Sequence, residues 1–298
     1  MERTNAYSLL DFLDNSPCNF FATATIQRYL DDNGFQELKQ SERWNLEKGG
    51  KYYVKKNDTA IFGFVIGETP LDQSGFNMIS AHSDSPCFRI KPNPEMLADG
   101  VLKLNTEVYG GPILYTWFDR PLSLAGRVIV RNPQNPARPI TKLIDFASPV
   151  LIIPHLAIHF NRNVNAGNPL SKQKDMLPIA AIVSDSMSKN NFLIDQIKER
   201  LEIADSKDIL DFDLMLYNCQ KSQLVGFNKE FICSGRIDDL SMAHAALSAL
   251  LNSDNPATTK VMAIFDNEET GSGTKQGAAS PVLASILHRV STCMGLDD

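Results

Sequence analysis

The stretch Lys260-Val261-Met262-Ala263-Ile264-Phe265-Asp266-Asn267-Glu268-Glu269 decides the fold, because an apolar run leads directly into four residues with carboxylate or amide oxygens. A short, nearly continuous apolar run is typical of a strand that is buried on both faces of a sheet. Two more runs, at residues 60–66 and 76–81, predict further central strands of this kind. Because ligands of open α/β sheets bind beyond the carboxyl ends of strands, we expect a functional site at residues 266–269.

Amphipathic helices are expected beside these strands. Helical periodicity covers residues 5–15 and 22–33. Later in the chain, Leu240, Ala243 and Leu247 share one face of a helix that precedes the strand quoted above. Helices and strands that alternate in this way predict an α/β fold.

The middle of the chain has a different texture, with short β-rich runs separated by Pro, Gly and Asn. Residues 101–108 and 124–131 are two such runs, and their regular spacing is typical of a barrel or a sandwich. We therefore expect an α/β domain that is interrupted by a β-rich insertion. The expected domain boundaries are 1–92, 93–235 and 236–298.

Composition narrows the class of protein and its partners. With 298 residues, 43% of them apolar and 21% charged, the chain can bury a core and is not of the disordered class. The charged residues, 29 basic and 35 acidic, form no basic cluster, so no nucleic-acid partner is expected. No run approaches the roughly 18 apolar residues that cross a membrane, so no membrane partner is expected either.

The cellular location follows from the start of the chain and from its cysteines. The polar start is unlike a signal peptide. Five scattered Cys with no Cys-x-x-Cys pair fit a reducing compartment and predict neither a disulfide framework nor a structural zinc knuckle. We therefore expect a cytoplasmic protein.

Three segments carry polar residues where apolar elements begin or end. His82 leaves a strand, and Asp84 can hold the imidazole while it ligates a metal, although a histidine that caps the strand end is the alternative. Asp238 precedes a helix, where it either caps that helix or bridges two cations. Glu268 and Glu269 can divide metal binding and proton transfer between them, or can form a solvated acidic loop. Together the segments fit a hydrolytic metal site better than any one does alone.

Several motifs resemble the signatures of the aspartyl aminopeptidases, in the same order and along essentially the whole chain. The motifs are Ala81-His82-Ser83-Asp84-Ser85-Pro86, Tyr109-Gly110-Gly111, Trp117-Phe118-Asp119-Arg120-Pro121-Leu122, Ile153-Pro154-His155-Leu156-Ala157-Ile158-His159, Ser234-Gly235-Arg236-Ile237-Asp238-Asp239-Leu240 and Phe265-Asp266-Asn267-Glu268-Glu269-Thr270-Gly271-Ser272. By these motifs the chain is identified as a member of this family of two-metal, dodecameric exopeptidases and is most similar to its bacterial members. The resemblance implies a zinc-exopeptidase-like catalytic domain of three α/β/α layers, interrupted by a β-rich dimerisation insertion.

The resemblance also implies a role for each residue of the site. His82 ligates one metal, Glu269 ligates the second, and Asp238 bridges both. Glu268 is the general base, and Asp84 holds the ring of His82.

The family's insertion drives dimerisation and offers a histidine to the active site of the neighbouring subunit. The matching segment contains two candidates, His155 and His159, and we prefer His159 for this role. Packing in the core is the other interpretation for both, and it is the one that we expect for His155. His244 and His288 match no ligand of the family, and a packed or surface position is expected for His244.

The activity that the resemblance implies is metal-assisted removal of acidic residues from peptide N-termini. Two divalent cations, zinc by default with manganese or cobalt as alternatives, activate a water, and Glu268 passes its proton to the leaving amine. The expected partners are such peptides and further copies of the chain, as dimers that assemble into a dodecamer. A related tetrahedral family of broader specificity shares this metal chemistry but is expected to lack Asp119-Arg120-Pro121-Leu122.

The C-terminus departs from the family pattern. Family members continue with a second aspartate ligand and a final histidine ligand, and no Asp or His after Glu269 matches either one. We therefore expect a truncated chain that gives each metal two side-chain ligands, where catalytic zinc usually has three, and that leaves an edge of its sheet exposed. Two hypotheses follow: an aminopeptidase chain, or a truncated non-catalytic subunit that acts only in assembly or interaction.

Overall fold

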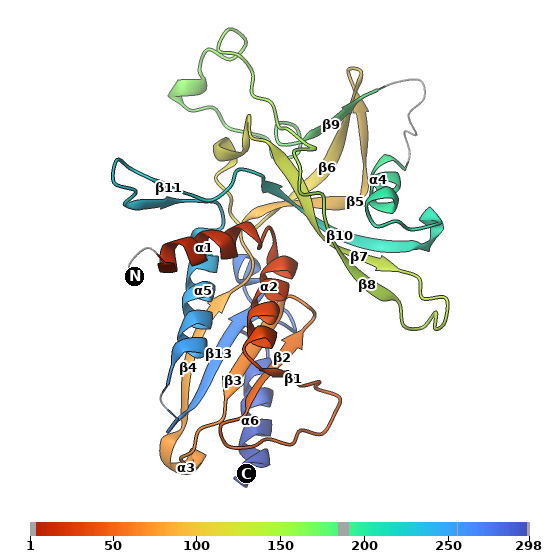
Figure 1. Cartoon of the computed structure of the whole chain (residues 1–298). Coiled ribbons are helices and arrows are strands. Elements are labelled where there is room, and N and C mark those ends of the chain that lie inside the picture. Colours follow the sequence, from red (N-terminus) through yellow and green to blue (C-terminus); the bar gives the residue numbers. More distant parts are fainter. Residues whose placement is uncertain (1–3, 184–190, 255, 297–298) are drawn as a thin grey trace. The chain divides into compact units, whose positions relative to one another are not determined.

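The computed structural model describes residues 4–183, 191–254 and 256–296 (Figure 1). The chain divides into two compact units. The α/β unit comprises Met1–Ser85 and Ser222–Asp298, and the β unit comprises Pro86–Lys221. The β unit begins before residue 93 because β5 (Cys87–Ala98) pairs with strands of that unit.

The α/β unit is built on a five-stranded mixed sheet with the order β1-β2-β3-β13-β4. Its strands are β1 (Gln36–Glu37), β2 (Lys51–Lys56), β3 (Ala60–Val65), β13 (Thr259–Phe265) and β4 (Phe76–His82). β4 and β13 are parallel neighbours, and Phe265 lies opposite His82 in their register. The polar segments that follow these two strands therefore leave the sheet side by side, and this adjacency positions the candidate site.

Helices cover both faces of this sheet, which makes three layers (Figure 1). One face is covered by α1 (Thr4–Asp14), α2 (Asn19–Asp32) and α5 (Ile237–Asn252), and the other face by α6 (Val282–Cys293). Along β13, Met262 and Ile264 pack toward α5, whereas Val261 and Ala263 pack toward α6. Burial on both faces explains the continuous apolar run, and the expected α/β/α layers are confirmed.

One of the expected central strands lies at an edge. β4 pairs with β13 on one side, and no strand of the described residues pairs with its other side. Its side chains alternate between the two faces, and both Met78 (55% exposed) and Ile79 (42% exposed) are open to solvent, whereas Ile61 and Phe62 of β3 are fully buried. The prediction of a central strand is thus correct for β3 and β13 and wrong for β4, where the exposed edge lies.

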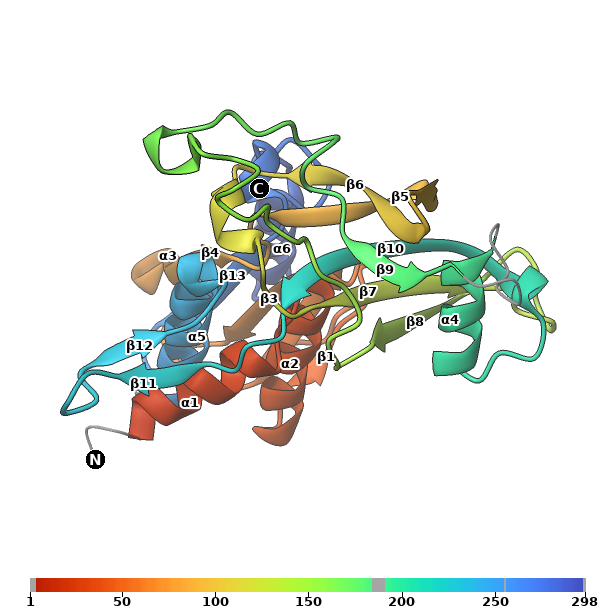
Figure 2. The same cartoon turned by 90° about the horizontal axis from the view of Figure 1, so that it is seen from above.

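The β unit contains a six-stranded antiparallel sheet with the order β8-β7-β10-β5-β6-β9. Besides β5, its strands are β6 (Val101–Tyr109), β7 (Leu122–Val130), β8 (Ile140–Asp145), β9 (Ile179–Ile182) and β10 (Ile209–Asn218). Figure 2 shows β7, β8 and β10 side by side. α4 (Phe192–Arg200) adds Leu193 and Ile197 to the core of this unit. The expected barrel or sandwich is wrong, because the strands described here form one open sheet with edges at β8 and β9.

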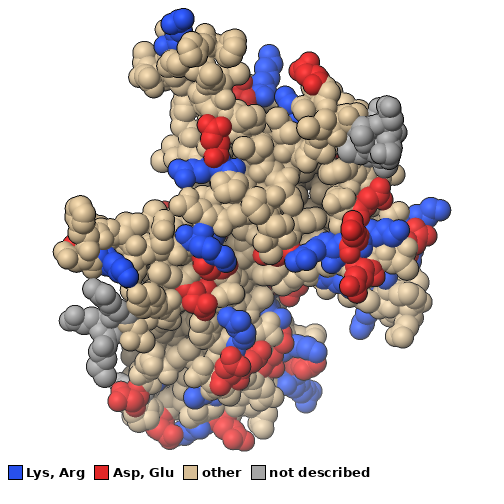
Figure 3. Space-filling view, turned by 45° about the horizontal axis from the view of Figure 1, so that its top comes forward, with Lys and Arg blue, Asp and Glu red and all other residues tan. Residues whose placement is uncertain are grey.

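Short elements complete both units. In the α/β unit these are α3 (Leu71–Ser74), the hairpin of β11 (Gln223–Val225) and β12 (Phe231–Cys233), and the 3-10 helix η4 (Glu268–Thr270). In the β unit they are η1 (Leu114–Trp117), η2 (Val164–Ala166) and η3 (Ser206–Asp208). Among the described helices, none combines the length and apolar character that crossing a membrane requires. Figure 3 shows acidic and basic side chains intermixed over the visible face.

Candidate metal centre

The first component of the candidate site is His82, the last residue of β4. Its side chain is 13% exposed, and its Nδ1 lies 3.2 Å from Oδ1 of Asp84, a residue that is 1% exposed. The same Nδ1 lies 3.1 Å from the carbonyl oxygen of Asp84. A buried carboxylate beside Nδ1 fixes the orientation of the ring and leaves Nε2 available as a ligand atom.

Asp84 also holds the loop that follows β13. The backbone N–H of Glu268 donates to Oδ1 of Asp84, and the backbone N–H of Glu269 donates to Oδ2, both over 3.2 Å. One buried carboxylate therefore joins the segment after β4 to the segment after β13. The sequence predicted only its contact with the imidazole.

The start of α5 brings two more carboxylates to His82. Asp238 and Asp239 have non-helical backbone angles there, and the peptide bond between them is cis. Nε2 of His82 lies 3.4 Å from Oδ1 of Asp238 and 3.8 Å from Oδ2 of Asp239. Oδ2 of Asp239 also accepts a hydrogen bond from the backbone N–H of His82 over 3.2 Å. Asp239 has no role predicted from the sequence, because an acidic residue at a helix start is an ordinary capping pattern.

These side chains form a set of donor atoms that fits a divalent metal. Ligand atoms of His82, Asp238 and Asp239 lie within 4.8 Å of one another, and so do those of His82, Glu268 and Glu269. Two atoms that bind one tetrahedral zinc at about 2.0–2.2 Å are about 3.3–3.6 Å apart. The 3.4 Å between His82 and Asp238 matches that spacing, and the 3.9 Å between Nε2 of His82 and Oε2 of Glu268 is slightly longer. We refer to these five residues as the His82 cluster.

The cluster concentrates negative charge around one imidazole. Burial by itself lowers the pKa of His82, but the hydrogen bond and charge of Asp84, together with the charges of Asp239 and Glu268, outweigh burial and raise that pKa to about 9. Burial raises the pKa of Asp239, and burial together with the charge of Asp84 raises the pKa of Glu269. A cation held among these carboxylates would stabilise their charged forms.

The remaining histidines lie outside this cluster. His159 is exposed and belongs to the β unit, in the segment between Ile153 and η2. His155 is half-buried and packs edge-to-face on the ring of Phe118 at 4.5 Å between ring centroids. His244 is half-buried: its Nε2 lies 2.9 Å from Oγ of Ser8, and its ring centroid lies 5.5 Å from that of Phe12.

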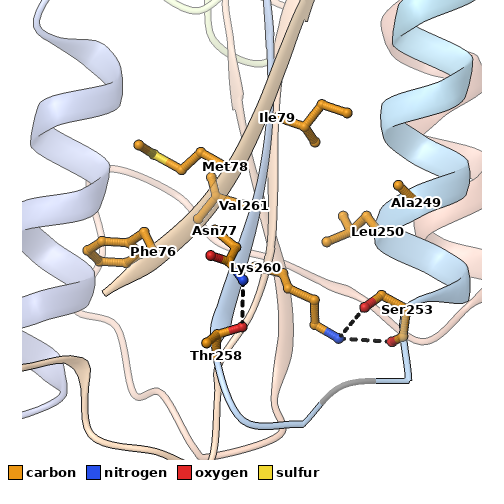
Figure 4. A pocket seen from close by; sticks show the side chains of 10 residues that line it. All are labelled: Phe76, Asn77, Met78, Ile79, Ala249, Leu250, Ser253, Thr258, Lys260 and Val261. Carbon is orange, nitrogen blue, oxygen red and sulfur yellow. Dashed lines mark hydrogen bonds between the residues drawn. The ribbon is translucent and has the colours of Figure 1, made fainter. Parts of the chain in front are cut away.

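A groove of about 460 Å³ lies along the first half of β4 (Figure 4). It is lined by Phe76, Asn77, Met78, Ile79, Ala249, Leu250, Ser253, Thr258, Lys260 and Val261. Its polar side chains are paired: Asn77 donates to Oγ1 of Thr258 over 2.9 Å, and Nζ of Lys260 donates to the carbonyl of Ser253 over 2.9 Å. None of the lining residues is acidic or a histidine, so the groove offers no group for metal-assisted hydrolysis.

Known proteins resemble this chain in sequence and in fold. Residues 12–297 match the family described as "Aminopeptidase I zinc metalloprotease (M18)". The chain is 51% identical over 286 residues to a probable M18 family aminopeptidase 2 of Clostridium novyi. The aligned region covers 96% of this chain and 66% of that protein. The structure of Ape4 in its complex with Nbr1 has a TM-score of 0.92 at 33% identity and covers 99% of this chain and 60% of that one. The structure of mApe1 from Chaetomium thermophilum has a TM-score of 0.88 at 32% identity, covering 98% and 68%.

The extent of these matches defines what the chain shares with its relatives. The chain spans about two thirds of the length of the curated relatives it matches. The matched region includes all the segments that form the His82 cluster, as well as the whole β unit. The chain therefore belongs to the aminopeptidase I zinc metalloprotease (M18) family, as its motifs predicted.

Proposed function

We propose that this chain is a metal-dependent aminopeptidase that removes acidic residues from the N-termini of peptides. The observation that carries the proposal is the convergence of His82, Asp238, Glu268 and Glu269 at the carboxyl ends of two parallel strands. Membership of the M18 family supports the class of reaction. The preference for acidic residues rests on the resemblance to the aspartyl aminopeptidases.

The cluster would hold two divalent cations. In this proposal His82 and Asp238, whose ligand atoms belong to one group, would hold one cation. Glu269 would hold the second together with Asp238, with zinc as the first candidate and manganese or cobalt as alternatives. Asp239 lies beside the first pair, since its Oδ2 is 3.8 Å from Nε2 of His82. Such cations would polarise the scissile carbonyl and lower the pKa of the attacking water, so that it loses its proton more readily and becomes a better nucleophile.

The protein's own residues then move the proton and hold the geometry. Glu268 takes the proton from the attacking water and delivers it to the leaving amine, and its side chain is 58% exposed, so substrate and water can reach it. The hydrogen bonds from Glu268 and Glu269 to Asp84 fix the backbone on which both carboxylates are carried. The contact between Asp84 and Nδ1 fixes the ring of His82 in turn.

The proposal extends to the assembly and location of the protein. His159 would be offered to the active site of a neighbouring copy, within a homo-oligomer of dimers that assemble into a dodecamer. Its exposed position in the β unit leaves it available for such a contact. The scattered cysteines support a cytoplasmic location. The similarity to M18 aminopeptidases favours an enzyme over the alternative, a non-catalytic subunit.

Hydrolysis of two chromogenic substrates by the purified chain tests the activity. We expect aspartyl-p-nitroanilide to be cleaved faster than leucyl-p-nitroanilide when zinc, manganese or cobalt is added, and Glu268→Gln to abolish cleavage of both. Glu47→Gln is the matched control, because Glu47 is exposed and precedes β2 at the other end of the sheet. A folded wild-type chain that cleaves neither substrate with any of the three metals contradicts the proposal.

A further inference from the structure

A second buried carboxylate lies directly behind the His82 cluster and has no role in the mechanism so far. Asp266 is the first residue after β13, and its side chain is 1% exposed. Although it is only two residues from Glu268, it belongs to neither group of ligand atoms that converges on His82. Its side chain is therefore engaged elsewhere.

The carboxylate of Asp266 accepts hydrogen bonds from the neighbouring backbone N–H and from two side chains of other segments. Nδ2 of Asn19, at the start of α2, donates to Oδ1 over 3.0 Å, and the backbone N–H of Asn267 donates to the same oxygen over 2.8 Å. Nε2 of Gln276, in the segment before α6, donates to Oδ2 over 3.4 Å. Asn19 and Gln276 are 3% and 8% exposed, so both side-chain donors are shielded from water.

The loop between β13 and η4 is thus held by buried carboxylates along three consecutive residues. The backbone N–H of Asn267 is accepted by Asp266, and those of Glu268 and Glu269 are accepted by Asp84. Asn267 has a left-handed backbone with φ of 61°, a conformation that residues other than glycine adopt at a cost. The hydrogen bond to Asp266 stabilises that conformation at the turn from which the Glu268 and Glu269 side chains depart.

A role in folding alone does not account for a charged group at this position. Burying a carboxylate is expensive even when it is hydrogen-bonded, and an apolar side chain of similar volume often stabilises a protein equally well or better. An acceptor with two oxygens can, however, join the loop backbone to Asn19 and Gln276 at once, which an apolar side chain cannot do.

We propose that Asp266 is a positioning residue that fixes the turn at Asn267, so that Glu268 and Glu269 converge on His82. The inference rests on the proposed function of the cluster, which it extends to a residue that belongs to neither group of ligand atoms. Asn19 and Gln276 act through Asp266 by holding its carboxylate.

Metal affinity tests this role without relying on hydrolysis. Zinc binding to the metal-free full chain is measured by competition with a chromophoric chelator, with circular dichroism and thermal unfolding as checks on folding. Asp266→Asn places an amide donor among existing donors, and we expect zinc affinity to fall about 10- to 100-fold, the usual loss when a group behind a metal ligand is removed. Asp72→Asn, on the exposed surface of the same unit, is the matched control and should bind zinc like the wild type.

A second variant distinguishes positioning from general damage. Asn19→Leu removes one donor and keeps the carboxylate of Asp266. We expect this variant to weaken zinc binding as well, and it tests the positioning role if Asp266→Asn does not fold.

The outcomes separate this inference from the proposed function. Wild-type zinc affinity in folded Asp266→Asn, or in folded Asn19→Leu if the first variant does not fold, overturns the positioning role. If the wild type binds zinc and Asp266→Asn weakens that binding, but neither hydrolyses peptides, the proposed function fails and the positioning role stands. A wild-type chain that binds no zinc overturns both.

Discussion

β4 and β13 run parallel and share one register, yet the two ends of this strand pair carry opposite chemistry. At the carboxyl end, His82 faces carboxylates from α5 and η4, and Asp84 is buried beneath them. Along the first half of β4, Met78 and Ile79 are exposed and border a groove whose few polar side chains are paired with each other. We call these two regions the cluster end and the groove end.

The difference places the candidate reactive groups at one end of the strand pair and buried apolar packing at the other. Carboxylates that crowd together raise one another's pKa and repel, so the cluster end contributes reactivity at the expense of stability. The groove end has no such group among its lining residues, and Leu250 there is 5% exposed within the α5 core. Substitutions at the cluster end should therefore alter metal binding and turnover, and those at the groove end should alter the free energy of unfolding.

The largest effect is expected for Glu268→Gln. Loss of the proposed general base should reduce turnover of an acidic p-nitroanilide by about 10²- to 10⁴-fold. Because Glu268 is exposed and the change removes one of several like charges, the unfolding temperature should stay level or rise slightly. Steady-state kinetics and thermal unfolding of the same preparation check both parts. Turnover that stays within a few-fold of the wild type would remove Glu268 from the mechanism.

Leu250→Ala should produce the converse result at the groove end. Truncating this buried side chain should lower the free energy of unfolding by about 2–5 kcal/mol, through lost burial and the cavity it leaves. The folded fraction should bind zinc as the wild type does. Urea unfolding and zinc titration test the pair of expectations. A matching loss of zinc affinity would mean that the two ends are coupled through α5 and that the separation does not hold.

Asp84→Asn should act at the cluster end with a smaller effect than loss of the base. The amide can accept one hydrogen bond from the loop but not both, and it no longer complements the imidazole of His82. Zinc affinity should fall by about 10- to 100-fold. Zinc competition at fixed pH measures the change. Asp72→Asn, exposed on the same unit, is the control. Unchanged affinity would show that the two strand ends hold their ligands independently of Asp84.

Much of the fold follows from apolar runs, and its exceptions have a physical cause. The runs that became β3 and β13 are buried by helices on both faces, as a continuous apolar pattern predicts. The run that became β4 has the same pattern but lies at the edge of the sheet. The local apolar pattern indicates which side chains favour burial. It does not indicate whether a strand has hydrogen-bonded neighbours on both sides or on one side only. The β-rich runs were likewise identified as strands, but their joining into one open sheet depends on long-range pairing.

The candidate site was predictable where polar residues follow a strand and was missed where they resemble other signals. His82, Glu268 and Glu269 stand out because they interrupt apolar runs. Asp239 resembles an ordinary helix-start residue, and nothing in the sequence distinguishes buried Asp266 from a solvated loop aspartate. The opposition of Phe265 and His82, which brings the segments together, is set by strand register and not by local sequence.

The smallest expected effect concerns α5, the helix that connects the two ends. His244 lies on this helix beside Ser8 and Phe12 of α1, and burial lowers its pKa from the ordinary 6.5. Above that value the histidine is neutral in both the folded and the unfolded chain, and it does not affect the pH dependence of stability. As the pH falls through 6.5, the unfolded chain takes up a proton that the folded chain resists, so the folded state loses stability.

His244→Gln removes this proton uptake and should flatten the pH dependence. The free energy of unfolding of the wild type should fall more steeply than that of the variant between about pH 7.5 and about pH 5.5, a range that brackets the ordinary histidine pKa. Urea unfolding at both pH values measures the two slopes. Parallel slopes would mean that the histidine is protonated equally in the folded and unfolded chain. A positive charge on His244 would then be tolerated where α5 packs on α1. The contact between these two helices, which lies between the cluster end and the groove end, would not require a neutral side chain.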